Sequence, residues 1–307
     1  MAIVSGRVLV AALTFSSLAA DALAQQKHSA RAPQQVPAFV SGNELFSNWS
    51  HPNRDARLSI QPTPTPTPEV NVYVPEVALQ VTVRVISDGG SGSGVIVARS
   101  GQTYTVLTND HVVNDSAENG YTVMTADGLT HQARRLRSAK FGDMDLALLQ
   151  FTSSDQSARP YQVAAMGDSQ RLSIGDRVYA AGYPNWKLYN QGNALENTRE
   201  GGLSAFRLTT GTIGMLPGLS LQKGYRVGYT NDIKSGMSGG PVLDRYGQLI
   251  AINGRLKHPL QGIRAFKLAD GTMPSVQLYR QMADLSWAIP IATFQQTKNK
   301  SVLGGVP

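Results

Sequence analysis

The chain has 307 residues, a net charge of +7 and no cysteine, and 41% of its residues are hydrophobic. This length and hydrophobic content suit one large or two small globular domains with a sizeable core. The missing cysteines exclude disulfides, thiol catalysis and cysteine-based metal sites. The basic residues are dispersed except between Arg134 and Lys140, without aromatic interleaving, so we expect no nucleic-acid partner.

The N-terminal residues have the layout of a secretory signal peptide. Arg7 precedes an apolar stretch from Val8 through Ala20, and Ala22-Leu23-Ala24 forms a small-x-small cleavage site. The stretch is short for a membrane span, and an uncleaved anchor or a buried helix is the alternative. We therefore expect residues 1–24 to be removed on export. The mature protein would then be periplasmic or extracellular, without a membrane span.

Residues 25–75 are polar and proline-rich, and the alternating Pro and Thr of 62–68 predict a disordered, extended linker. From Gln80 onward, short alternating or apolar segments end in Gly, Asn, Asp or Ser, a pattern that favours a sandwich or barrel over a parallel sheet. Helical periodicity is confined to Val276–Met282 and Ile291–Thr297. Strands are predicted at Val81–Ile86, Val95–Ala98, Tyr104–Leu107, Tyr121–Thr125, Leu146–Phe151, Arg177–Ala181, Phe206–Thr209, Tyr225–Tyr229, Leu249–Ile252 and Trp287–Ile289.

A serine flanked by glycines stands at Ser238, in the segment Gly236–Val242. Glycines allow a tight turn that exposes the hydroxyl and aims peptide N–H groups into a cavity, or they form an ordinary turn. On the first interpretation Ser238 is a nucleophile, and the N–H groups of Gly236 and Ser238 form an oxyanion hole.

A serine nucleophile needs a base, and the base needs a carboxylate that orients it. His111 is the best candidate base, because it stands where an apolar strand ends in a polar step, whereas the other histidines lie in the tail, a polar strand or a loop. Asp145 opens a strand that should be buried, where a carboxylate is costly without a partner. Asp143 is the rival, and Asp110 adjoins His111 too closely in sequence for an easy contact.

The segments 108–113, 145–149 and 236–242 together resemble trypsin-like serine peptidases, and the bacterial HtrA-like branch most of all. The segments 92–97, 165–169 and 285–290 also fit that branch. The resemblance implies an all-β, chymotrypsin-like fold of two packed six-stranded antiparallel barrels with a short C-terminal helix. The resemblance spans about residues 80–297. The peptidase domain is expected at 76–297, with the first barrel at about 76–160 and the second at about 161–297, followed by a tail at 298–307. Residues 255–284 have no counterpart in that branch. The PDZ domain that usually follows in HtrA proteins is missing from this sequence.

The resemblance also bears on specificity and activation. Asp232 stands, without gaps, where trypsins that cleave after Lys or Arg keep an acid, yet Lys234 is close enough to neutralise it. HtrA-like enzymes have apolar pockets, and Trp287 would narrow the pocket, so cleavage after Val or Ala is favoured. The candidate pocket residues are Asp232, Asn253, Gly254, Ser286 and Trp287. Met237 replaces the aspartate that pairs with a new N-terminus in trypsins, so that activation is not expected.

The resulting hypothesis is a secreted serine endopeptidase that acts on polypeptides without metal or cofactor, of undetermined oligomeric state. The alternative is a catalytically silent peptidase fold used for binding, because fold does not establish activity. An α/β-hydrolase esterase is a further rival through the G-x-S-x-G pattern. It would need a helix after Ser238 and a later histidine, and only His258 is available.

Overall fold

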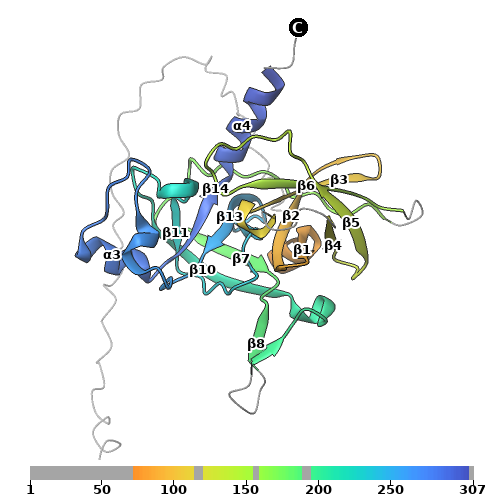
Figure 1. Cartoon of the computed structure of the whole chain (residues 1–307), viewed down its shortest axis with the longest axis horizontal. Helices are drawn as coiled ribbons and strands as arrows, with labels where there is room; N and C mark the ends of the chain where they lie inside the picture. Colours follow the sequence, from red (N-terminus) through yellow and green to blue (C-terminus); the bar gives the residue numbers. More distant parts are fainter. Residues whose placement is uncertain (1–71, 114–119, 155–158, 189–194, 304–307) are drawn as a thin grey trace, which may run out of the picture. The chain divides into compact units, whose positions relative to one another are not determined.

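The computed structural model describes residues 72–113, 120–154, 159–188 and 195–303, which lie in one compact unit that begins at Thr67 (Figure 1). The expected signal peptide and all but the end of the expected linker lie outside these residues. No helix in this part of the chain is long and apolar enough to cross a membrane.

The first barrel is closed by six antiparallel strands in the order β1-β2-β3-β6-β5-β4. Side chains in strands such as β6 alternate between buried and more exposed positions, and each strand places apolar residues in the barrel interior. The interior is built from residues such as Val83, Val106 and Leu149. The strands are β1 (Thr82–Ser87), β2 (Gly90–Ser100), β3 (Thr103–Thr108), β4 (Tyr121–Met124), β5 (Thr130–Arg135) and β6 (Ala147–Thr152).

The second barrel repeats this topology with its own six strands, closed in the order β10-β11-β14-β13-β12-β7. Numbered along the chain within each barrel, both follow the cyclic order 1-2-3-6-5-4. The strands are β7 (Arg177–Gly182), β10 (Arg207–Met215), β11 (Val227–Tyr229), β12 (Pro241–Leu243), β13 (Leu249–Arg255) and β14 (Ser286–Pro290). The expected chymotrypsin-like fold class, two packed six-stranded barrels, is therefore confirmed.

An apolar layer joins the barrels, combining Val95 and Leu107 of the first with Ala181 and Ile252 of the second. Helix α1 (Val74–Val81) completes this layer. Its buried residues Val74, Ala78 and Val81 recur at helical spacing, and it contacts β7 and β12 although it precedes the first barrel in sequence. The helix begins two residues before the expected domain start at 76.

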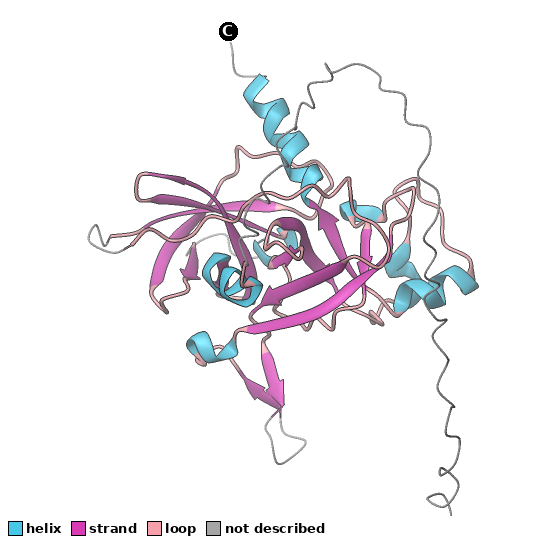
Figure 2. Ribbon diagram, turned by 180° about the vertical axis from the view of Figure 1, so that it is seen from behind, coloured by secondary structure: helices cyan, strands magenta, loops and turns pink. Residues whose placement is uncertain are grey.

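The remaining elements lie outside the barrels. The hairpin of β8 (Trp186–Leu188) and β9 (Leu195–Asn197) and the C-terminal helix α4 (Ile291–Leu303) project from opposite sides of the barrel pair (Figures 1 and 2). Further short helical segments lie between the strands. They are α2 (Asp110–Val113), α3 (Val276–Ala283), and the 3-10 turns η1 (Gly202–Ala205), η2 (Gln222–Gly224) and η3 (Gly262–Phe266).

Candidate active site

Strand pairing in the first barrel brings His111 and Asp145 together. β3 and β6 pair so that Thr108, at the end of β3, lies opposite Ala147, at the start of β6. His111 follows β3 in α2, and Asp145 lies two residues before the start of β6. The buried Asn109 fastens the two segments, because its side-chain amide donates to the carbonyl of Asp145 at 2.8 Å.

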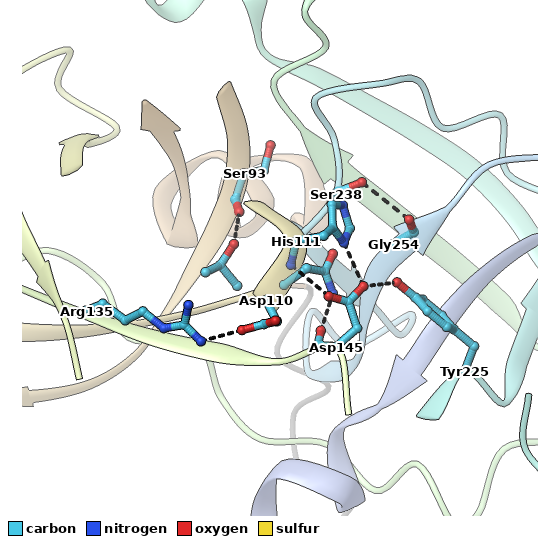
Figure 3. Close-up of polar contacts among 10 residues, drawn as sticks. Ser93, Asp110, His111, Arg135, Asp145, Tyr225, Ser238 and Gly254 are labelled. Carbon is cyan, nitrogen blue, oxygen red and sulfur yellow. Dashed lines mark hydrogen bonds and ion pairs between the residues drawn. The ribbon is translucent and has the colours of Figure 1, made fainter. Parts of the chain in front are cut away.

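The Asp145 carboxylate accepts both the backbone N–H and the imidazole of His111 (Figure 3). The distances are 2.9 Å from the His111 nitrogen to Oδ1 and 2.6 Å from Nδ1 to Oδ2. Burial works to raise the pKa of Asp145, but the hydrogen bonds and charge of its partners outweigh burial and hold that pKa below its usual value. A neutral imidazole that donates from Nδ1 keeps Nε2 as an acceptor, which is the state a general base requires.

A third donor to Asp145 is Tyr225, which comes from the second barrel just before β11. Its buried hydroxyl donates to Oδ2 of Asp145 (Figure 3). The pKa of Tyr225 lies well above its ordinary value, first because of burial and then because of the Asp145 charge. A side chain at Gly254 would overlap the Tyr225 hydroxyl, so glycine is needed there for this contact. The sequence shows no sign of the pairing, since Tyr225 and Asp145 are 80 residues apart.

The Ser238 turn is held against the first barrel by Ser93 of β2. The Ser93 backbone N–H donates to the Ser238 carbonyl at 2.8 Å, and its hydroxyl donates to the Gly236 carbonyl at 2.8 Å. Gly239 has a left-handed φ of +85°, and a side chain there would overlap the Ser93 carbonyl. The motif therefore needs glycine at this position both for its backbone angle and for the close approach of the two barrels.

The expected oxyanion-hole amides are free of internal partners in the described residues. The carbonyl that precedes Gly236, that of Ser235, is turned away and accepts the Asn185 N–H at 2.8 Å. The N–H groups of Gly236 and Ser238 have no hydrogen-bond partner in this part of the chain. Two unpartnered amides on either side of Met237 can together receive an oxygen that carries negative charge.

The Ser238 hydroxyl is not hydrogen-bonded to His111 in this structure. It donates over a long 3.4 Å to the carbonyl of Gly254, a residue that lines the same cleft as His111 (Figure 3). Nucleophile and base are commonly loose in the absence of substrate, and a rotation of the serine side chain redirects the hydroxyl.

The rival residues lie elsewhere. Asp110 forms an ion pair with Arg135, as Figure 3 shows, and Asp143 is exposed to solvent. His258, the histidine that an esterase would need, is exposed and lies 3.4 Å from Asp284. Ser238 is followed by Gly239, Gly240 and then β12, not by a helix, which removes the local structure of an α/β-hydrolase elbow.

The comparison with known proteins agrees with this arrangement. A family model described as a trypsin-like peptidase domain matches residues 92–252, a range that contains His111, Asp145 and Ser238.

The chain belongs to the trypsin-like peptidases.

Proteins called "Serine protease HtrA-like" from three strains of Staphylococcus aureus, USA300, NCTC 8325 and COL, are also similar to it. Each is 27% identical over 220 residues, which cover 67% of this chain and 22% of the relative. The match thus spans about a fifth of the length of these relatives.

The residues expected to form a primary pocket of this trypsin-like domain separate into two groups. Asp232 is half exposed and forms ion pairs with Lys234 at 2.9 Å and with Arg207 at 3.9 Å. Gly254 borders Ser238, because its carbonyl accepts from the Ser238 hydroxyl. The other three are fully buried and donate hydrogen bonds to backbone carbonyls, so we do not assign them to a pocket wall. Asn253 donates to Ala181, Ser286 to Asn231, and Trp287 to Met282.

Met237, the residue before the nucleophile, is buried in the core of the second barrel together with Ile233 and Tyr229. Its backbone N–H donates to the Lys234 carbonyl at 2.9 Å. The loop that leads to Ser238 is thus shaped by apolar packing and local hydrogen bonds. Within the described residues, no group of three or more His, Asp or Glu side chains is placed to hold a metal ion.

Proposed function

We propose that this protein is a secreted serine endopeptidase that uses Ser238 as nucleophile, His111 as general base and Asp145 as the residue that orients the base. One observation carries the proposal. The imidazole held by Asp145 lines the same cleft as Gly254, whose carbonyl accepts from Ser238, and the turn around this serine leaves two backbone N–H groups without partners in the described residues.

The reaction begins when the Ser238 hydroxyl turns from Gly254 toward Nε2 of His111. The serine oxygen then attacks the peptide carbonyl while His111 takes its proton, and the Gly236 and Ser238 amides stabilise the negative oxygen. Asp145 holds the imidazolium in place. His111 next protonates the leaving amine, and a water activated by the same imidazole releases the acyl group from Ser238.

A fluorophosphonate probe and a peptide library together test this proposal. The wild-type protein should be labelled on Ser238 and should cleave peptides, and Ser238→Ala should lose both properties. Ser100→Ala, a change at an exposed serine of β2, should retain them. A folded wild-type protein that neither labels nor cleaves would instead support the silent binding protein.

Export is the second part of the proposal and is tested separately. Residues 1–24 carry the signal-peptide pattern, so N-terminal sequencing of the exported protein should start at Gln25. Recovery of Met1 at the N-terminus of the exported protein would contradict it.

A further inference from the structure

A cleft of about 950 Å³ opens directly beside His111 and Gly254. One wall comes from the segment after β13, which includes Leu260 and Arg264 and has no counterpart in the trypsin-like resemblance. This segment is anchored to the second barrel, because the buried ring of Phe266 packs edge-on against Trp287. The cleft is therefore lined partly by a segment for which the trypsin-like resemblance offers no counterpart.

Positive charge dominates the lining of this cleft. Lys223, Arg255 and Arg264 line it together with two carboxylates, Asp110 and Asp145. Both carboxylates already have partners, Asp110 in Arg135 and Asp145 in His111 and Tyr225. None of the three cations has a carboxylate within ion-pair distance in the described part of the chain.

Arg255 is the cation best placed to receive an anion. Its guanidinium stacks over the Tyr225 ring at 4.6 Å, half-buried beside the catalytic groups. Its Nη1 is shielded from solvent and has no hydrogen-bond partner. A guanidinium presents a planar fork that matches a carboxylate, so an acidic side chain in the cleft can bind the part of the Arg255 guanidinium that faces the cleft and neutralise its charge.

Lys223 is held in the same cleft by an uncommon backbone conformation. Its φ is +69°, a left-handed value that non-glycine residues adopt rarely, and its carbonyl accepts the Asp145 N–H at 3.0 Å. Such backbone conformations tend to occur at functional sites. The conformation places the lysine at the cleft while its backbone supports the segment that carries Asp145.

The edge of β13 offers a place for an extended peptide. β12 pairs with β13 only as far as Ile252, whereas β14 pairs with it up to Arg255. Beyond Asn253, the edge of β13 that faces Ser238 is therefore not covered by β12. An extended chain can add to such an edge through backbone hydrogen bonds, which brings its side chains next to Arg255.

We propose, on the basis of the peptidase function inferred above, that this cleft selects substrates with a Glu or Asp residue within about four residues of the scissile bond. Arg255 is the principal specificity-determining residue, and Lys223 and Arg264 add to the attraction.

The experiment compares peptide libraries that differ by one charge. Libraries with Glu or the isosteric Gln fixed at each position near the cleavage site are hydrolysed by the wild-type protein, Arg255→Gln, Arg255→Lys and Arg264→Gln. The wild type should prefer Glu by about tenfold or more at one position. Arg255→Gln should remove most of this preference, Arg255→Lys should keep part of it, and Arg264→Gln should reduce it mildly.

Arg245→Gln is the matched control, because Arg245 also stacks over a tyrosine, Tyr246, at 4.8 Å, but in an exposed turn outside the cleft lining. It should leave the Glu preference unchanged. A Glu-to-Gln ratio near one in a wild type that the fluorophosphonate labels would overturn the cleft proposal alone. So would a preference that survives Arg255→Gln.

A binding measurement keeps the cleft proposal independent of catalysis. Fluorescence anisotropy with the Ser238→Ala protein compares the affinity of the Glu-containing and Gln-containing libraries. Tighter binding of the Glu libraries that Arg255→Gln abolishes supports the cleft even if the wild type fails to label. Equal binding of both libraries overturns it.

Discussion

The two halves of the candidate site are held in different ways. His111 and Asp145 come from the first barrel and are joined by side-chain hydrogen bonds, with Tyr225 added from the second barrel. Ser238 comes from the second barrel and is held through its backbone, by Ser93 of the first. Each half therefore depends on the opposite barrel for its final geometry.

The difference shows which half is prepared for the proposed chemistry. The imidazole is already oriented by its carboxylate, whereas the serine hydroxyl still donates to Gly254. A backbone-held turn fixes the amides of Gly236 and Ser238 but leaves the hydroxyl free to rotate. Substrate binding thus has one side-chain rotation to bring about, which is a small change compared with rebuilding a loop.

The largest effect is expected from removing a reacting group from either half. Ser238→Ala and His111→Ala should each lower kcat/KM by a factor on the order of a million, because triad members act as a unit. Asp145→Asn should cost less, on the order of ten-thousandfold, since it alters the tautomer and not the reacting atoms. Thermal unfolding should show all three proteins folded, and full activity in Ser238→Ala would contradict the site.

A glycine substitution should break the backbone-held half selectively. In Gly239→Ala the new methyl group meets the Ser93 carbonyl, so the turn must shift and kcat should fall by roughly a hundredfold to a thousandfold, as for a lost oxyanion donor. Labelling by the fluorophosphonate should slow in parallel.

Gly175→Ala is the control for this effect. Gly175 has a similar φ of +94°, but a methyl group there meets nothing within 4 Å. It should cost only about 1 kcal/mol of stability and no activity. An equal loss of activity in both variants would show that backbone strain, and not contact between the barrels, controls the turn.

The hydrogen bond from Tyr225 allows a finer test of the side-chain half. Tyr225→Phe removes one donor from a buried carboxylate, and hydrogen bonds to charged groups contribute about 1.5–3 kcal/mol. We expect stability at neutral pH to fall within that range and kcat/KM to fall by roughly tenfold, because His111 is less firmly oriented. Tyr246→Phe, at an exposed tyrosine, should change neither.

The acid dependence of stability should change with the same variant. The pKa of Asp145 is lowered in the folded protein, so its contribution to stability is complete above the ordinary carboxyl value of about 3.9 and is lost as the pH falls through the lower folded value. Tyr225→Phe moves the folded pKa back toward the ordinary value and should make that loss smaller. Chemical denaturation of the wild type and of Tyr225→Phe between neutral pH and pH 3 measures how the free energy of unfolding of each protein depends on pH.

Sequence reasoning predicted those parts of the molecule that local patterns encode. Alternation, periodicity or glycine placement over a few residues predicts the strand segments, the turn around Ser238, and the helices at Val276–Met282 and Ile291–Thr297. Tyr225 and Ser93 were not predicted, because their roles arise from contacts between distant segments. Trp287 was expected at a pocket, yet its indole lies in the core, since position in a strand does not tell which face is buried.

The smallest effect, none on activity, is expected from cutting the N-terminus. Met237 is packed in the second barrel, where it cannot pair with a new terminal amine, so a chain that begins at Gln25 and one that begins at residue 72 should have the same kcat/KM. A third chain, which begins at Thr82, provides the contrast because it lacks α1. The buried residues of this helix, Val74, Ala78 and Val81, belong to the layer between the barrels. Each fully buried valine contributes about 1.5–3 kcal/mol to stability, so this third chain should unfold at a clearly lower temperature. Kinetics and thermal unfolding of the three chains separate the outcomes. A large rise in activity at one defined cut before residue 72 would mean that the turn at Ser238 is completed by the new terminus and not by its own packing.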